Sequence, residues 1–231
     1  MDISEIFSDS YISYPFSNSK RIIGLGFLLS ICSLLIIPVV FAGGYLLRII
    51  ENTLNGDYEL PPFGQWRKMF IDGLKVITVV LLYMLPGIIC FSTVTFMVLS
   101  KNTLILDSWL PFILMILAGI MALLGYILSL AAIPRMVYKD KFKTAFNIKN
   151  VIKDIFGIGL EKYAISLIGF SIMAIYLILI AEFLQDMFSF IGLTTSLIGL
   201  FIINILVYSL LIASQGRFIG LVYLEGINKT S

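Results

Sequence analysis

Residues 61–75 read PPFGQWRKMFIDGLK, and the 25 residues that follow, 76–100, carry no charge. On a helical wheel the apolar side chains of the first segment share one face: Phe63, Trp66, Phe70 and Leu74. The charged side chains lie mostly on the other face, which is typical of a helix in a membrane–water interface. The uncharged run is long enough to cross a hydrocarbon core of roughly 30 Å. The stretch therefore predicts an interfacial helix that leads into a transmembrane span.

The composition indicates that lipid is the solvent for most of the chain. Apolar residues make up 59% of the 231 residues and charged residues only 13%. A soluble domain of this size could not cover so much apolar surface with so few polar side chains. We therefore expect an all-α integral membrane protein of one domain, residues 1–231. The net charge of only +2 says nothing by itself about acidic partners. We expect no nucleic-acid partner.

Further uncharged runs suit membrane spans, and they cover 22–47, 108–134, 163–181 and 187–216. With the run at 76–100 they predict about five transmembrane helices. Tight turns are expected at 101–107 and 182–186, where charges interrupt the runs.

The first run, 22–47, follows a Lys-Arg pair and so resembles the start of a signal peptide. It is too long for one and lacks a convincing small-residue cleavage site. A span interrupted by Pro38 is the expected structure, and a re-entrant segment is the alternative.

A second amphipathic helix is predicted within the basic segment 135–162. Apolar residues recur there at helical spacing: Ile148, Val151, Ile152, Ile155 and Phe156. Lysines, asparagines and Asp154 occupy the rest of the wheel. This pattern predicts a second interfacial helix.

Two sequence echoes predict an internal repeat. Residues 70–74 resemble 156–160 at an offset of 86, and 137–140 resemble 222–225 at an offset of 85. The nearly equal offsets favour duplication into 61–140 and 147–225. Each repeat would be an interfacial helix and a hairpin of two spans. The expected architecture is a lone first span followed by two parallel hairpin repeats.

Charge placement predicts the orientation in the cell membrane. With five spans, one surface holds three basic residues and the other holds thirteen, on 48–75, 135–162 and the tail. Because cytoplasmic loops carry the excess of Lys and Arg, loops 48–75 and 135–162 are expected to be cytoplasmic. The amino terminus would then lie outside, although Lys20 and Arg21 argue locally against that. A re-entrant first run would place both termini in the cytoplasm.

The usual catalytic constellations are missing from the sequence. Histidine is absent, which removes the commonest general base and metal ligand. We predict no catalytic, cofactor-binding or metal site, and we do not expect an enzyme. The acidic residues nearest the runs fall at predicted span ends, where water reaches them: Asp72, Asp107, Glu182 and Asp186. The lack of a charge deep in a span weighs against ion-coupled transport.

Asn204 is the clearest polar residue inside a predicted span, with Thr194 and Thr195 about two turns earlier. They are candidates for a polar path through the membrane. Hydrogen bonding between helices is the alternative explanation, and we favour it.

Several short motifs resemble a known family. They are Tyr14-Pro15-Phe16, Gly44-Tyr45-xx-Arg48, Leu60-Pro61-Pro62-Phe63-xx-Trp66 and Asp72-Gly73-Leu74. Together they resemble a prokaryotic, largely archaeal, family of polytopic membrane proteins known as domain of unknown function 4013. The resemblance extends over about residues 14–225. It implies an all-helical membrane protein and supplies no substrate, cofactor or catalytic residue.

Two functional hypotheses follow. The leading one is a non-enzymatic membrane protein that organises lipid or protein partners through its cytoplasmic interfacial helices. Anionic headgroups are the expected lipid partners of the basic loops, and a homo-oligomer or a protein partner is also possible in this role. The alternative is a transporter or channel for a small solute or lipid, with a path between the repeats near Asn204. An enzyme ranks third.

Overall fold

The structure is a computed structural model that describes residues 2–32, 37–100 and 109–230, and every regular element in these ranges is a helix. The amino-terminal part contains α1 (Ile3–Ser8), α2 (Ser19–Cys32) and α3 (Ile37–Leu54). The remainder contains α4 (Trp66–Leu99), α6 (Leu110–Tyr138), α7 (Ile148–Ile158), α8 (Leu160–Ile191), α9 (Leu193–Ile203) and α10 (Ser209–Thr230). A π-helical turn, Asn204–Tyr208, joins α9 to α10 without a break.

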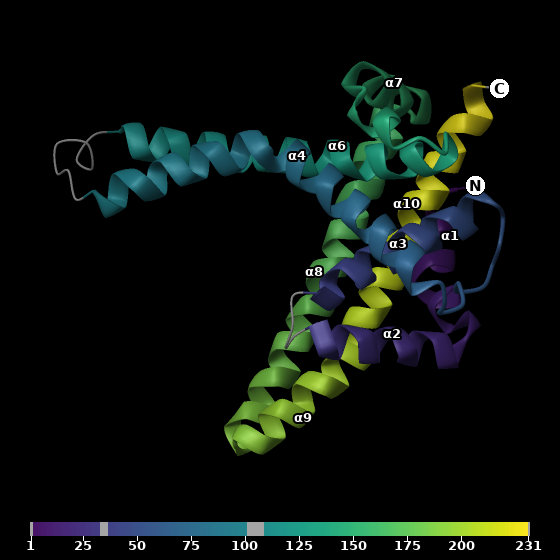
Figure 1. Cartoon of the computed structure of the whole chain (residues 1–231), viewed down its shortest axis with the longest axis vertical. Coiled ribbons are helices and arrows are strands. Elements are labelled where there is room, and N and C mark those ends of the chain that lie inside the picture. The colour runs from purple at the N-terminus through teal and green to yellow at the C-terminus, as the bar shows by residue number, and fades with distance from the viewer. Residues whose placement is uncertain (1, 33–36, 101–108, 231) are drawn as a thin grey trace.

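Four helical segments of the described ranges are long and apolar enough to cross a membrane: α4, α6, α8 and the continuous segment Leu193–Ile227. They pair as two hairpins (Figure 1). Hairpin one is α4 with α6, and hairpin two is α8 with α9 and α10. The predicted turn of hairpin one at 101–107 falls outside the described residues. The length and composition of these helices suit a multi-pass membrane protein.

The first uncharged run does not form one straight span. It is divided between α2 and α3, with residues 33–36 outside the described ranges. Leu25 of α2 and Tyr45 of α3 belong to the same buried cluster, yet in one continuous helix they would lie about 30 Å apart. Neither helix is among the four that could cross a membrane. The span expected over 22–47, interrupted by Pro38, and its re-entrant alternative both stay predictions.

The predicted interfacial helix at 61–75 and the second span are one helix, α4. It begins at Trp66, after Gln65 in a left-handed conformation (φ 46°). The prolines at 61 and 62 precede this start by several residues instead of occupying the first helical turn. The amphipathic stretch from Trp66 to Lys75 is thus the first part of a 34-residue helix.

Hairpin two turns later than the sequence predicted. Glu182 and Asp186 both lie within α8, so the predicted turn at 182–186 is wrong. The chain reverses at Gly192, whose φ of 151° is a conformation that only glycine adopts readily. The Thr195 hydroxyl supports the turn by hydrogen bonding the Gly192 carbonyl oxygen at 2.7 Å.

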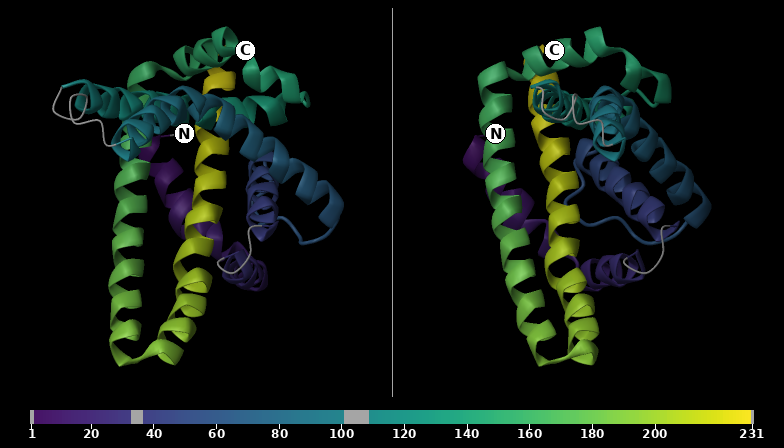
Figure 2. Two further views of the ribbon diagram at one scale, coloured as in Figure 1. Left: turned by 60° about the vertical axis from the view of Figure 1, so that its left-hand side comes forward. Right: turned by 90° about the vertical axis from the view of Figure 1, so that its left-hand side faces the viewer.

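The two hairpins diverge from a common junction. Hairpin one leaves the side of hairpin two and points in a different direction (Figures 1 and 2). Among the described residues the backbone of α4 does not approach α8, α9 or α10. The backbones of the two hairpins meet through α6 and α10, and Tyr163 of α8 also donates its hydroxyl to the Ile127 carbonyl oxygen of α6 at 2.8 Å. The two hairpins therefore do not lie side by side along their lengths (Figures 1 and 2). α7 lies over the junction and packs on α6, α8 and α10.

Small residues set the crossing of α3 and α4 at this junction. A Cβ on Gly44 would lie 1.9 Å from the carbonyl oxygen of Met69, and one on Gly73 would lie 1.7 Å from that of Val40. Both contacts are with backbone, which cannot rotate away. The two glycines therefore allow the helices to touch along their backbones.

Candidate functional site

The family-like motifs converge on residues 57–65, which we name the proline loop. Tyr45 of α3 donates its hydroxyl to the Pro61 carbonyl oxygen at 2.9 Å, and its ring stacks on Phe63 with centroids 4.6 Å apart. Arg48, one turn later, donates to the carbonyl oxygens of Gly64 at 2.7 Å and Gln65 at 3.1 Å. A loop of this kind forms no backbone ladder of its own, so side chains from α3 satisfy its carbonyls. Burial raises the pKa of Tyr45 and keeps its phenol a neutral donor.

Arg217 of α10 fixes the amino-terminal segment and the proline loop to hairpin two. Its side chain is 2% exposed, and its Nε donates to Asp9 Oδ2 at 2.7 Å. Its Nη1 donates to the Asp57 carbonyl oxygen at 2.8 Å, and the guanidinium lies 4.7 Å from the ring centroid of Tyr14 and 5.0 Å from that of Tyr58. The guanidinium donors and both ring contacts are thus used within the chain itself. The cluster around Arg217 is therefore a structural joint.

Asp72, expected at a wet helix end, is buried against the same junction. Its side chain is 4% exposed, and Oδ1 accepts a hydrogen bond from Lys75 Nζ at 2.7 Å. Asp107, the acid expected at the end of the next turn, lies outside the described residues. In the described ranges no three acidic, cysteine or histidine side chains are grouped so that they could hold a metal ion.

A basic pocket opens between α6, α7 and α10, with a volume of about 490 Å³. Arg135 of α6 forms an ion pair with Asp154 of α7, and the Tyr223 hydroxyl donates to the same carboxylate at 2.8 Å. Lys139 and Lys153 also line the pocket, and both are exposed. Arg135 Nε is buried and has no hydrogen-bond partner in the part of the chain that is described. The pocket thus combines a guanidinium donor with two lysines that form no ion pair in the described ranges, although Lys139 Nζ lies 5.0 Å from the ring centroid of Tyr138.

The predicted anchors of α7 divide into a buried row and an exposed row. Val151 and Ile155 are buried in the core at the junction. Ile148, Ile152 and Phe156 are 52%, 38% and 63% exposed. These three recur every four residues, so they form one stripe along α7. We name Ile148, Ile152 and Phe156 the α7 stripe.

The predicted anchors around the start of α4 also fall into two groups, those that pack against the rest of the protein and those that stay exposed. Phe63 belongs to the proline loop and Phe70 packs on Phe41 of α3, with ring centroids 5.4 Å apart. Trp66 also contacts Phe41, yet Trp66 and Leu74 remain exposed. The apolar face of 61–75 is therefore used partly to join α3 to α4.

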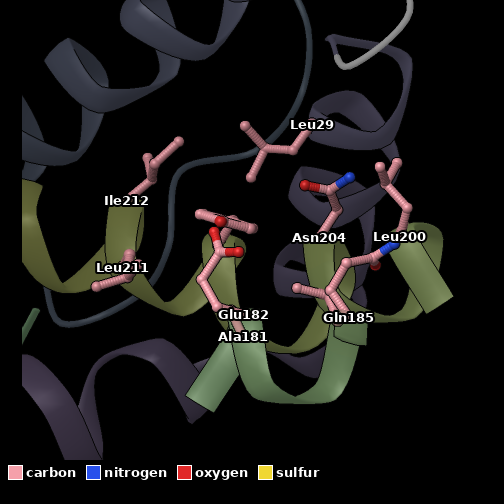
Figure 3. A pocket seen from close by; sticks show the side chains of 10 residues that line it. Leu29, Ala181, Glu182, Gln185, Leu200, Asn204, Leu211 and Ile212 are labelled. Atoms are coloured by element: carbon pink, nitrogen blue, oxygen red, sulfur yellow. The ribbon is translucent and has the colours of Figure 1, made fainter. Parts of the chain in front are cut away.

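Asn204 lines a second pocket of about 460 Å³, between hairpin two and α2, which we name the hairpin-two pocket. Its polar side chains are Glu182 and Gln185 from α8, and Asn204 and Tyr208 from the π-helical turn. Figure 3 shows the Glu182 carboxylate and the Asn204 amide extending from different helices toward Leu29 of α2. Glu182 was predicted to lie at a span end, because its charge was interpreted as a turn signal.

The other two residues of the predicted polar path do not line this pocket. Thr195 donates its hydroxyl to the carbonyl oxygens of Phe188 and Gly192, at the tip of hairpin two. Thr194 is exposed at the same tip. The structure thus separates Asn204 from the two threonines with which it was grouped.

Comparison with known proteins identifies a family. A family model described as "Protein of unknown function (DUF4013)" matches residues 28–185, from the end of α2 to Gln185 in α8. No curated protein and no solved structure matches the chain.

Proposed function

This chain belongs to the DUF4013 family of proteins of unknown function, and we propose that it is a non-enzymatic multi-pass membrane protein that organises anionic lipid at the cytoplasmic face. The observation that carries the proposal is the pairing, on α7, of the exposed α7 stripe with the basic pocket. An interfacial helix needs an apolar row that enters the acyl chains and cations that meet the headgroups. α7 provides the first and borders the second.

The apolar half of this pairing is the α7 stripe. Its side chains stay exposed although Val151 and Ile155 on the adjoining face are buried. Burial of the stripe among acyl chains would remove that apolar area from water. Lys149 and Lys153 follow Ile148 and Ile152 directly, so their ammonium groups can reach the headgroups while the stripe is immersed.

The cationic half is the basic pocket. A lipid phosphate there would meet Lys139 and Lys153, each of which is worth about 1 kcal/mol near an anionic surface. The unpartnered Nε of Arg135 offers a further donor to a phosphate oxygen. Asp154 is already engaged by Arg135 and Tyr223, so its charge opposes an anion less than a free carboxylate would.

The orientation forms part of the proposal. Segments 48–75 and 135–162 hold most of the basic residues outside the long helices, and we assign both to the cytoplasm on that ground. Glu51 of α3 and Lys68 of α4 come within 3.8 Å of each other. The basic start of α4 thus lies against the amino-terminal helices, and α7 lies at the end of α6.

A duplication of the hairpin also remains a proposal. The two echoes make Tyr138 the equivalent of Tyr223, at an offset of 85 residues. Their rings meet edge to face, with centroids 6.2 Å apart. Contact between equivalent residues supports descent of 61–140 and 147–225 from one ancestral unit. It also places the ends of both repeats beside the basic pocket.

The test is lipid retention by the purified full chain. The variant K139Q/K153Q removes the two exposed lysines of the basic pocket, and K141Q/K143Q removes two exposed lysines of the same segment from outside it. Native mass spectrometry of chains exchanged with phosphatidylglycerol or phosphatidylcholine should show phosphatidylglycerol adducts on the wild type and the control. The pocket variant should lose them. Equal loss from both variants, or no loss from either, would contradict the proposal.

A second candidate function, passage of a small solute or lipid, is favoured by one observation. A pocket reaches Asn204, although it lies between hairpin two and α2 instead of between the repeats. Reconstituted protein that accelerates the exchange of a fluorescent lipid between leaflets would support this candidate. Exchange that is no faster than in the same vesicles without protein would reject it.

A further inference from the structure

We propose that the hairpin-two pocket binds an amphiphile with a protonated primary amine as its headgroup. The proposal concerns a different site from the basic pocket and does not depend on anionic lipid binding at α7. It follows from a carboxylate and an amide oxygen, both without a cationic partner, on the wall of an otherwise apolar pocket in a membrane hairpin.

The size and lining of the pocket suit such a ligand. A volume of about 460 Å³ falls within the usual range for small-molecule sites, roughly 300–1,000 Å³. Polar side chains converge from α8 and the π-helical turn, whereas Leu29, Leu200 and Leu211 provide apolar walls. A headgroup can therefore meet the polar wall while an alkyl chain follows the leucines.

Glu182 supplies the charge that the ligand must match. It is the only charged side chain that lines the pocket, and among the described residues it forms no ion pair. It is exposed on α8, directly after the uncharged run 163–181. An ionised carboxylate at such a place is costly unless a cation accompanies it. A cationic headgroup removes that cost.

Gln185 indicates that the cation carries N–H donors. Its amide nitrogen is used, because it donates to Ser196 Oγ at 3.0 Å and to the Ser196 carbonyl oxygen at 3.3 Å. Its Oε1 is buried and has no hydrogen-bond partner in the described part of the chain. A primary ammonium has three donors and can serve both Glu182 and Gln185, whereas a quaternary ammonium has none. The pocket should therefore prefer the primary amine.

The backbone around the pocket departs from regular helix. Asn204–Tyr208 is a π-helical turn inside an otherwise α-helical segment, a distortion that often marks a functional site. α2 presses on this turn, since a Cβ on Gly26 would lie 2.4 Å from the Cα of Ile205. That close approach places Leu29, one turn later on α2, over the pocket. The π-helical turn and Gly26 together shape a site that straight helices would not form.

Other ligand classes fit the pocket less well. A carboxylate or phosphate headgroup would be repelled by Glu182. A bare metal ion needs several oxygen ligands, commonly more than one of them charged, and the described residues provide no such group of three.

The experiment measures binding of dodecylamine to the full chain in maltoside micelles by titration calorimetry, with dodecyltrimethylammonium and dodecanoate as comparison ligands. Glu182→Gln keeps the shape of the side chain and removes its charge. Asp186→Asn, one turn later on α8 and outside the pocket, removes the same charge and serves as the matched control. Leu29→Trp fills the pocket without changing a charge.

We expect saturable dodecylamine binding to the wild type and to Asp186→Asn. Affinity should fall by more than about tenfold in Glu182→Gln, because the ligand loses its counter-charge, and binding should disappear in Leu29→Trp. Dodecyltrimethylammonium should bind more weakly, and dodecanoate should not bind. Equal loss in Asp186→Asn, unchanged affinity in Glu182→Gln, or binding that survives Leu29→Trp would overturn the proposal. Should Glu182→Gln fail to fold, the Leu29→Trp result and the order of the three ligands decide.

Discussion

Asp9 and Arg217 are separated by 208 residues and form an ion pair of 2.7 Å, in which the guanidinium is almost entirely buried. The pair joins the amino-terminal segment to the last helix. Two neighbouring tyrosines lie against the guanidinium, and a carbonyl of the proline loop accepts from it. The junction from which both hairpins project is therefore fixed by a contact between the two ends of the chain.

Loss of the Asp9 carboxylate should destabilise the whole junction. In Asp9→Asn the Arg217 guanidinium stays buried without its counter-charge, which costs on the order of 3 kcal/mol. Asp57→Asn is the control, because Asp57 gives Arg217 only a backbone carbonyl as hydrogen-bond acceptor. Unfolding in mixed detergent–SDS micelles measures both. A loss for Asp57→Asn as large as that for Asp9→Asn would contradict the role assigned to the ion pair.

The crossing of α3 and α4 should not tolerate a methyl group at Gly73. In Gly73→Ala the new Cβ would meet the backbone oxygen of Val40, and the helices must separate, at a cost of about 1–3 kcal/mol. Gly119 of α6 has open space at the same position, so Gly119→Ala should be neutral or stabilise by up to about 1 kcal/mol through helix propensity. The same unfolding measurement compares the two. Similar effects from both substitutions would show that the close approach at Gly73 is unimportant.

The α7 stripe should lie among acyl chains when the protein is in a bilayer. A spin label at position 156, introduced as Phe156→Cys in a background without Cys32 and Cys90, should be more accessible to oxygen than to a water-soluble nickel chelate. A label introduced through Lys149→Cys should show the reverse order. Electron paramagnetic resonance in lipid nanodiscs gives both accessibilities. Greater accessibility to nickel at position 156 would mean that the stripe faces water.

Much of the helical layout could be predicted from the sequence, because long uncharged runs have few alternatives in lipid. The runs at 76–100 and 108–134 became α4 and α6, and α7 begins one residue after Asn147, whose side chain accepts from the Asn150 amide as an N-cap. Whether the segment 61–75 forms a helix of its own was harder to predict, since an amphipathic turn can continue directly into a transmembrane helix. α4 does so from Trp66.

The errors have identifiable physical causes. Charges at Glu182 and Asp186 were interpreted as a turn, whereas the chain turns at Gly192, inside an uncharged run. The only local signal was Gly192, with Thr194 and Thr195 two and three residues later. The burial of Arg217 and the assembly of the hairpin-two pocket depend on contacts across distant parts of the chain, which periodicity does not encode.

We propose that both hairpins cross the bilayer and that α7 lies on the opposite side from their tips. Single cysteines placed at Ser100 on hairpin one, Thr194 at the tip of hairpin two and Lys149 on α7, in a background without Cys32 and Cys90, can be labelled in intact cells with a membrane-impermeant maleimide. We predict labelling at 100 and 194 from outside the cell, and labelling at 149 only after the cells are opened. Labelling of all three positions from the same side would contradict the account.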